Sequence, residues 1–145
     1  MLGRTVAPSQ GLLLPEDGVD TPETLRIVRD MTRRLHVAGC RGGWMIVSGH
    51  EVVGLCSYKH PPENGAVEIG YGVAAPYRRR GHATNAVALM LVHAQADPAV
   101  QRVLARTELA NLASQRALER NGFVRHAVDG DPAEGEEILW RRELL

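Results

Sequence analysis

A short segment rich in arginine and glycine, Arg78-x-x-Gly81-x-Ala83, lies between a predicted strand and a predicted helix. The first turn of a helix has unpaired backbone N–H groups and a partial positive charge, so it can bind an anion. Small residues at Gly81 and Ala83 allow the backbone to approach closely, and the guanidinium groups of Arg78, Arg79 and Arg80 suit phosphate oxygens. The pattern indicates a pyrophosphate or sugar-phosphate site. The alternative is a solvated basic turn that only precedes a helix.

The common nucleotide and metal motifs are missing from the sequence. It contains neither a G-x-G-x-x-G dinucleotide fingerprint nor the G-K-[ST] of a P-loop. Cys40 and Cys56 form no C-x-x-C pair, and the histidines lack metal-ligand spacing, so we expect no metal site. We expect the thiols to be reduced. No apolar run approaches the roughly 20 residues that span a bilayer, and the start does not resemble a signal peptide. The sequence therefore predicts a cytoplasmic protein without a membrane partner.

Hydrophobic spacing and turn residues predict alternating helices and strands. A cap at Asp20 or Thr21 begins a helix that reaches about Val37. The other predicted elements are a hairpin of 44–47 and 52–56, a strand over 67–73, a helix from 83 to about 97, a strand over 103–107, a helix over 111–121, and a hairpin of 123–124 and 138–140 around an acidic turn. This order predicts an α/β (α+β) fold in a single domain, 1–145, with residues 1–19 irregular apart from an edge strand at 12–14.

The overall charge and the aromatic content weigh against a nucleic-acid partner. The chain has 17 basic and 17 acidic residues, so its net charge is zero, and aromatic residues make up only 4%. A general nucleic-acid binder needs a basic field, and single-stranded bases need aromatic stacking surfaces. A small module that binds RNA or a nucleotide through Arg78 to Arg80 is a weaker alternative, which salt-dependent RNA binding would support.

Four motifs in this order resemble the GNAT superfamily of acetyl-CoA-dependent N-acetyltransferases. They are Val67-Glu68-Ile69-Gly70-Tyr71-Gly72-Val73, Arg78-x-x-Gly81-x-Ala83, Asn111-x-x-Ser114 and Asn121-Gly122-Phe123. The resemblance covers about residues 44–142 and is greatest to the branch that acetylates protein N-termini and small amines. It implies a mixed central sheet flanked by helices, with acetyl-CoA as co-substrate.

The resemblance also implies where acetyl-CoA binds. The pyrophosphate should lie against the backbone amides of the segment Arg78, Arg79, Arg80, Gly81, His82, Ala83 and Thr84. Tyr71, Gly72 and Val73 should pair with the pantetheine arm as an extra strand would, and the N–H near Val73 should donate to the oxyanion. Asn111 matches a cofactor-contacting position, and it can also act as a helix N-cap.

The catalytic assignments are less complete. Glu68 matches a glutamate that serves as general base in some members, acting through water, although its spacing from Val73 is one residue short of that in one branch. The alternative is a structural carboxylate. Leu118 stands where many relatives carry a tyrosine that acts as general acid, so Ser114 is the candidate for that role, or else only a local hydrogen bonder. Asn85 replaces a glutamate that many relatives carry.

The expected reaction is transfer of the acetyl group of acetyl-CoA to a primary amine of a small molecule, a protein N-terminus or a lysine. The alternative is a GNAT-fold domain that binds acetyl-CoA or CoA without transfer. Acidic residues near the final turn would attract a cationic acceptor, or they form only a solvated turn: Asp129, Asp131, Glu134, Glu136 and Glu137. Exposed edge strands are compatible with a homodimer.

Overall fold

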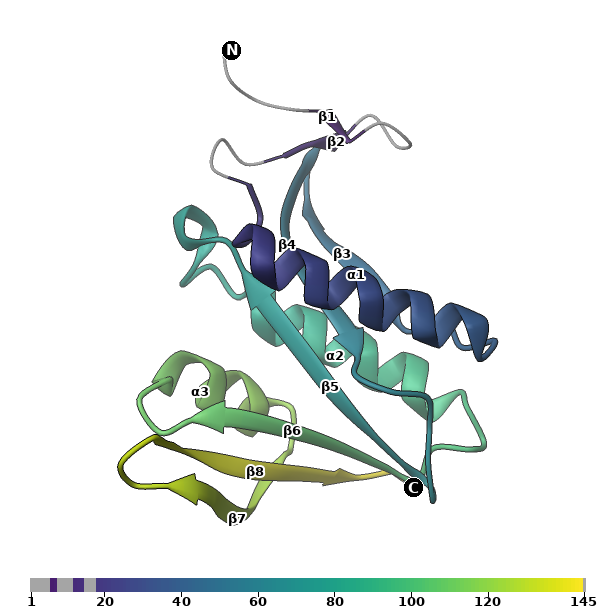
Figure 1. Cartoon of the computed structure of the whole chain (residues 1–145), viewed down its shortest axis with the longest axis vertical. Coiled ribbons are helices and arrows are strands. Elements are labelled where there is room, and N and C mark those ends of the chain that lie inside the picture. The colour runs from purple at the N-terminus through teal and green to yellow at the C-terminus, as the bar shows by residue number, and fades with distance from the viewer. Residues whose placement is uncertain (1–5, 8–11, 15–17, 145) are drawn as a thin grey trace.

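The computed structural model describes residues 6–7, 12–14 and 18–144. Within these residues the sheet has the order β1-β2-β4-β5-β6-β8-β7, and β3 also pairs with β4 (Figure 1). The strands are β1 Val6–Ala7, β2 Leu12–Leu13, β3 Gly43–Ser48, β4 Glu51–Tyr58, β5 Ala66–Val73, β6 Arg102–Glu108, β7 Val124–Asp131 and β8 Gly135–Glu143. The helices are α1 Pro22–Val37, α2 His82–Gln95 and α3 Leu112–Arg120, with a short 3-10 turn, η1, at Ala75–Tyr77. The predicted order of elements is confirmed.

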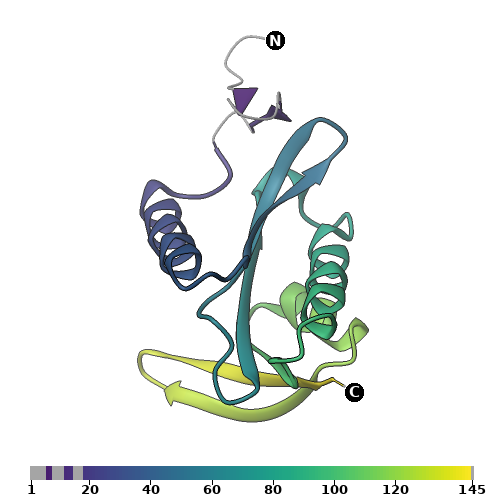
Figure 2. The same ribbon diagram turned by 90° about the vertical axis from the view of Figure 1, so that its right-hand side faces the viewer.

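The helices lie on opposite faces of the sheet. Figure 2 shows α1 on one side and α2 with α3 on the other. Alternation along β5 turns Val67 and Ile69 toward α2, where both belong to the buried cluster that includes Val87 and Met90. The face that carries α2 and α3 therefore holds most of the core, and the other face is covered by α1 only over β3 and β4.

Helix α1 begins and ends where its sequence predicts. The Thr21 hydroxyl accepts a hydrogen bond from the N–H of Thr24 at 3.1 Å, and Pro22 occupies the first helical position. Gly39 has a φ of +74°, a left-handed conformation that ends a helix without strain when the residue is glycine. Of the two predicted caps, Thr21 fills the position, which leaves the Asp20 carboxylate available for another contact.

The acidic turn predicted before the C-terminus is much shorter in the structure. Strand β7 runs to Asp131 and β8 starts at Gly135, so only Glu134 of the five acidic residues lies in the turn. Every residue of β7 is exposed because it is an edge strand that no helix covers. A strand that is wet on both faces has no alternation of apolar and polar residues, and this is why the pattern missed it.

Two features are absent from the part of the chain that the structure describes. None of its helices is long and apolar enough to cross a bilayer. No group of three or more His, Cys, Asp or Glu side chains in these ranges lies together in a way that could hold a metal ion.

Candidate functional site

The segment between β5 and α2 is a curled loop that leaves the start of α2 open. Arg79 has a φ of +65° and Gly81 a φ of +82°, so the chain turns sharply just before the helix. Gly81 is the N-cap, and a glycine offers no side chain to occupy the amides of His82, Ala83 and Thr84. A Cβ at Gly81 would meet nothing within 4 Å, and no side chain caps the start of the helix. The loop therefore has the shape and the donors for a phosphate group.

The three arginines of this loop have different surroundings. The Arg78 Nε donates to the carbonyl oxygen of Val73 at 2.9 Å, which ties the loop to the end of β5. The Arg80 guanidinium lies 5.6 Å from the centroid of the Tyr77 ring, and the Tyr77 hydroxyl donates to the Glu51 carboxylate. All three arginines are exposed, so each adds positive charge beside the start of α2.

Strands β5 and β6 separate after a short paired stretch. They pair in parallel only from Ala66–Arg102 to Glu68–Leu104, and β6 then continues to Glu108 alongside β8. Backbone groups of β5 alternate in direction. The Glu68 carbonyl accepts from Lys59 N, and the Ala74 N–H donates to Val53 on β4. The intervening odd-numbered residues, Ile69, Tyr71 and Val73, therefore turn their N–H and C=O groups toward the gap.

The backbone groups of Gly72 point in the opposite direction from those of Tyr71 and Val73. It pairs with Leu55 of β4, so its backbone groups face that strand and not the gap. Of the three residues predicted to pair with a pantetheine arm, Tyr71 and Val73 have the required direction. Because Gly72 has no side chain, it leaves space on the face of β5 that carries Glu68.

The Tyr71 side chain crosses from β5 to the start of α3. Its phenol oxygen lies 2.6 Å from the Ser114 hydroxyl oxygen, and Asn111 Oδ1 accepts from the N–H of Ser114 at 3.1 Å as the N-cap. Burial raises the pKa of the Tyr71 phenol above its usual value, although the Ser114 hydrogen bond acts in the opposite direction. The phenol therefore keeps its proton at neutral pH. Two hydroxyl groups meet at the gap between β5 and β6.

Glu68 stands on the other face of β5, at the last pair before the gap. Its carboxylate is 2.5 Å from Lys59 Nζ and 3.2 Å from Arg106 Nε, and Arg106 also contacts Asp129 at 3.2 Å. Burial alone would raise the pKa of Glu68, but the hydrogen bonds and charges of Lys59 and Arg106 lower it below its usual value. The carboxylate is therefore ionised at neutral pH and is a weak base.

One contact near Gly72 was not predicted from the sequence. A Cβ built on Gly72 would meet a single atom within 4 Å, Asp20 Oδ2 at 3.7 Å. The other Asp20 oxygen accepts from the N–H of Thr21 at 2.7 Å. The sequence marks Asp20 only as a candidate cap, because nothing local shows that a residue 52 positions earlier reaches β5.

Two features characterise this site. The start of α2 has no side-chain cap, and β5 separates from its parallel neighbour β6 beside it. Both agree with the match to a known family. The family model described as "Acetyltransferase (GNAT) domain" matches residues 16–124. The chain belongs to the GNAT acetyltransferase family.

Relatives and solved structures agree with a GNAT domain. The uncharacterized N-acetyltransferase YjdG of Bacillus subtilis is 37% identical over 84 residues, 56% of this chain and 50% of that protein, so the chain spans about half the length of this curated relative. A GNAT acetyltransferase from Bacillus anthracis has a TM-score of 0.66 at 21% identity, covering 88% of this chain and 77% of its own. RimL, a ribosomal protein α-N-acetyltransferase solved with coenzyme A, has a TM-score of 0.71 at 18% identity, covering 98% and 79%. AAC(6')-Ib, solved with paromomycin and acetyl-CoA, has a TM-score of 0.61 at 17% identity, covering 86% and 90%.

The lowered pKa of Glu68 in this GNAT domain predicts how its stability depends on pH. A carboxyl group with a depressed pKa in the folded state stabilises the protein above its unfolded pKa, near 4.5, and loses this effect as the pH falls through the folded value. Urea midpoints of the Glu68→Gln variant should therefore fall less than those of the wild type as the pH is lowered below about 4.5. Glu134→Gln, in the exposed turn, should follow the wild type. Parallel curves for wild type and Glu68→Gln would contradict the prediction.

Proposed function

We propose that this GNAT domain transfers the acetyl group of acetyl-CoA to a primary amine, either of a small molecule or of a protein N-terminus or lysine. The observation that carries the proposal is the gap between β5 and β6 next to the open start of α2. An elongated ligand with a phosphate at one end can lie across both features. RimL, an α-N-acetyltransferase of a ribosomal protein, supports the protein N-terminus as acceptor, and AAC(6')-Ib, solved with paromomycin and acetyl-CoA, supports the small-molecule amine.

The residues present fit the CoA part of the co-substrate. The amides of His82, Ala83 and Thr84 would bind the pyrophosphate, with Arg79 and Arg80 supplying charge. The odd-numbered residues of β5 would bond the amide groups of the pantetheine arm, as an added strand does. Val73 N–H, at the inner end of the same edge, would donate to the oxyanion. Asn111 holds Ser114 in place as the cap of α3.

The reaction requires one proton to leave the amine and one to reach sulfur. The amine nitrogen forms a bond to the acetyl carbon while the carbon–sulfur bond breaks. Glu68, ionised at the narrow end of the gap, would take the amine proton through a water molecule. Ser114, with the Tyr71 phenol 2.6 Å away, would supply the proton to the departing thiolate. The carbon–sulfur electron pair stays on sulfur, and solvent restores the proton of the hydroxyl pair.

A domain that binds acetyl-CoA or CoA without transfer is the second candidate function. The observation that favours it is the position of Glu68, whose carboxylate is held by Lys59 and Arg106 and has a lowered pKa. Such a carboxylate is a poor proton acceptor unless the amine arrives neutral. Release of free CoA in the presence of an amine distinguishes the two functions, because a binding domain releases none above the background.

Acetyl-CoA binding by calorimetry tests the cofactor site directly. In Gly81→Ala, a side chain at a φ of +82° costs about 1 to 2 kcal/mol in the loop conformation, so binding should weaken about tenfold. Gly39→Ala is the matched control, because Gly39 has a φ of +74° and equally open space but lies at the end of α1. No binding of acetyl-CoA to the wild type, or equal weakening in both variants, would contradict the proposal.

A further inference from the structure

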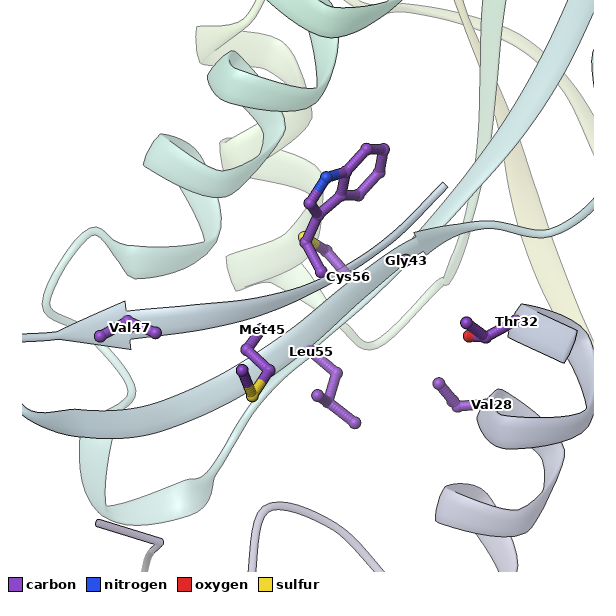
Figure 3. Close-up of a pocket in the computed structure, with 8 residues that line it drawn as sticks. Val28, Thr32, Gly43, Met45, Val47, Leu55 and Cys56 are labelled. Atoms are coloured by element: carbon purple, nitrogen blue, oxygen red, sulfur yellow. The ribbon is translucent and has the colours of Figure 1, made fainter. Parts of the chain in front are cut away.

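A groove separates α1 from the sheet on the face opposite α2. Its volume is about 470 Å³, and Figure 3 shows Val28 and Thr32 of α1 across from Met45 of β3 and Leu55 of β4. The Trp44 ring lies 4.8 Å from the ring of His93 in α2, so its side chain belongs to the other face of the sheet. The groove is lined mainly by apolar side chains, on the face of the sheet that lacks α2.

The groove exists because α1 is anchored at one end. Leu35, near its C-terminus, is 1% exposed, whereas Val28, two turns earlier on the same face of the helix, is only partly buried. Thr32 packs against Gly43, where a Cβ would lie 3.0 Å from its hydroxyl oxygen. The helix is therefore held close to the sheet at Gly43 and Leu35, and Val28 faces the sheet across an open space.

The groove is aligned with the candidate active site. Met45 pairs with Leu55, and Leu55 pairs with Gly72, so these three residues form one row across β3, β4 and β5 on the same face. The row ends at Gly72, next to Val73, where the missing side chain leaves room beneath Asp20. An elongated molecule in the groove would thus place one end between Asp20 and the gap of β5.

The charge at this end of the groove is negative. Asp20 has no ion pair with any of the residues that the structure describes, and its Oδ2 lies on the Gly72 side. Glu68 on the same face of β5 is neutralised by Lys59 and Arg106. Asp20 is therefore the carboxylate here that can attract a cation.

We infer that this groove binds the acceptor, and that the acceptor is a primary amine with an apolar body. Asp20 attracts the ammonium group to the space beside Gly72, where the amine gives one proton to solvent before it reacts, and the row of Met45 and Leu55, facing Val28, holds the apolar body. Such a body belongs to an alkylamine or to a peptide N-terminus with an apolar first residue. A polyamine would place a second charge against apolar side chains, which is unfavourable. The inference rests on the proposed function and adds the class of its acceptor.

Acetylation of three probe amines tests this class. Hexylamine and the peptide Met-Ala-Ala-amide represent the two sources of an apolar amine, and spermidine represents a polycation. We expect kcat/KM for hexylamine or for the peptide to exceed that for spermidine about tenfold or more. The better of the two identifies the source. Equal or higher kcat/KM for spermidine would overturn the inference.

The role of Asp20 has its own matched pair of variants. Asp20→Asn should raise the KM for the preferred amine about tenfold and leave the KM for acetyl-CoA unchanged. Asp30→Asn removes an exposed carboxylate from the outer side of α1 and should change neither. An unchanged amine KM in Asp20→Asn would overturn the assignment.

A binding measurement separates this inference from the proposed function. In methyl-labelled protein saturated with CoA, hexylamine should shift the signal of Met45 in the groove but not that of Met90, which is 3% exposed on the α2 face. Failure of acetyl-CoA to bind would refute the proposed function. Acetyl-CoA binding without a Met45 shift and without acetylation of either apolar amine would refute the acceptor class alone.

Discussion

Replacement of Tyr71 by phenylalanine should lower kcat about 100-fold, because loss of a positioned proton donor costs about 10² to 10⁴ in rate. The phenol lies 2.6 Å from the Ser114 hydroxyl, and burial raises its pKa, so it carries a proton over the whole neutral range. Calorimetry should show unchanged affinity for acetyl-CoA, since the backbone of β5, not the phenol, faces the pantetheine path. Steady-state kinetics with a primary amine measures the effect.

Ser114→Ala and a double variant complete this experiment. If the two hydroxyls act as one unit, Ser114→Ala should lower kcat by a similar factor, and the double variant should be little worse than either single one. Tyr58→Phe is the control. Tyr58 is 1% exposed on β4, and its phenol has no hydrogen-bond partner in the described part of the chain. Equal kcat for Tyr58→Phe and Tyr71→Phe would contradict the role of the pair.

Replacement of Gly54 by alanine should destabilise the protein by about 3 kcal/mol, at the upper end of what an inserted methyl group costs in a tightly packed site. A Cβ at Gly54 would overlap the carbonyl oxygen of Gly72 and lie 3.1 Å from the Cα of Val73. Both atoms belong to backbone that no side-chain rotation can move. Strand β5 would have to shift where its edge turns toward the gap, so acetyl-CoA affinity should fall as well.

Gly70→Ala is the matched control for Gly54→Ala. Gly70 is also an interior strand glycine, but the nearest atom to its added Cβ is the Cε of Lys59 at 3.2 Å, the flexible end of a side chain. Its unfolding midpoint in urea should stay close to that of the wild type. Equal midpoints for the two variants would mean that β4 and β5 tolerate crowding at Gly54, contrary to the geometry.

Local patterns predicted the parts of the site that one segment builds by itself. The loop before α2 was predicted because glycine and arginine at fixed spacing change the backbone of their own segment. The cap of α3 at Asn111 was predicted for the same reason, since a cap bonds a residue three positions away. Strand β5 was predicted because the turn residues 61–65 precede its own apolar segment.

The parts that the sequence did not predict depend on distant contacts. The Tyr71 and Ser114 hydroxyls are 43 positions apart, and only the packing of α3 on β5 brings them together. The direction of the Gly72 backbone follows from pairing with Leu55, which sequence spacing does not reveal. The full length of β7 was missed because solvent on both faces removes the periodic signal.

The short pairing of β5 with β6 gives the two halves of the sheet only a small backbone connection. Three register pairs, Ala66 to Glu68 with Arg102 to Leu104, carry the backbone contact between the half formed by β1 to β5 and the half formed by β6 to β8. Beyond this stretch the buried core, which includes side chains of both halves, holds them together in place of backbone hydrogen bonds. A ligand that bonds across the gap would fasten the halves together. Its binding energy would then appear as slower amide exchange in both halves, including β7 and β8, which it does not touch.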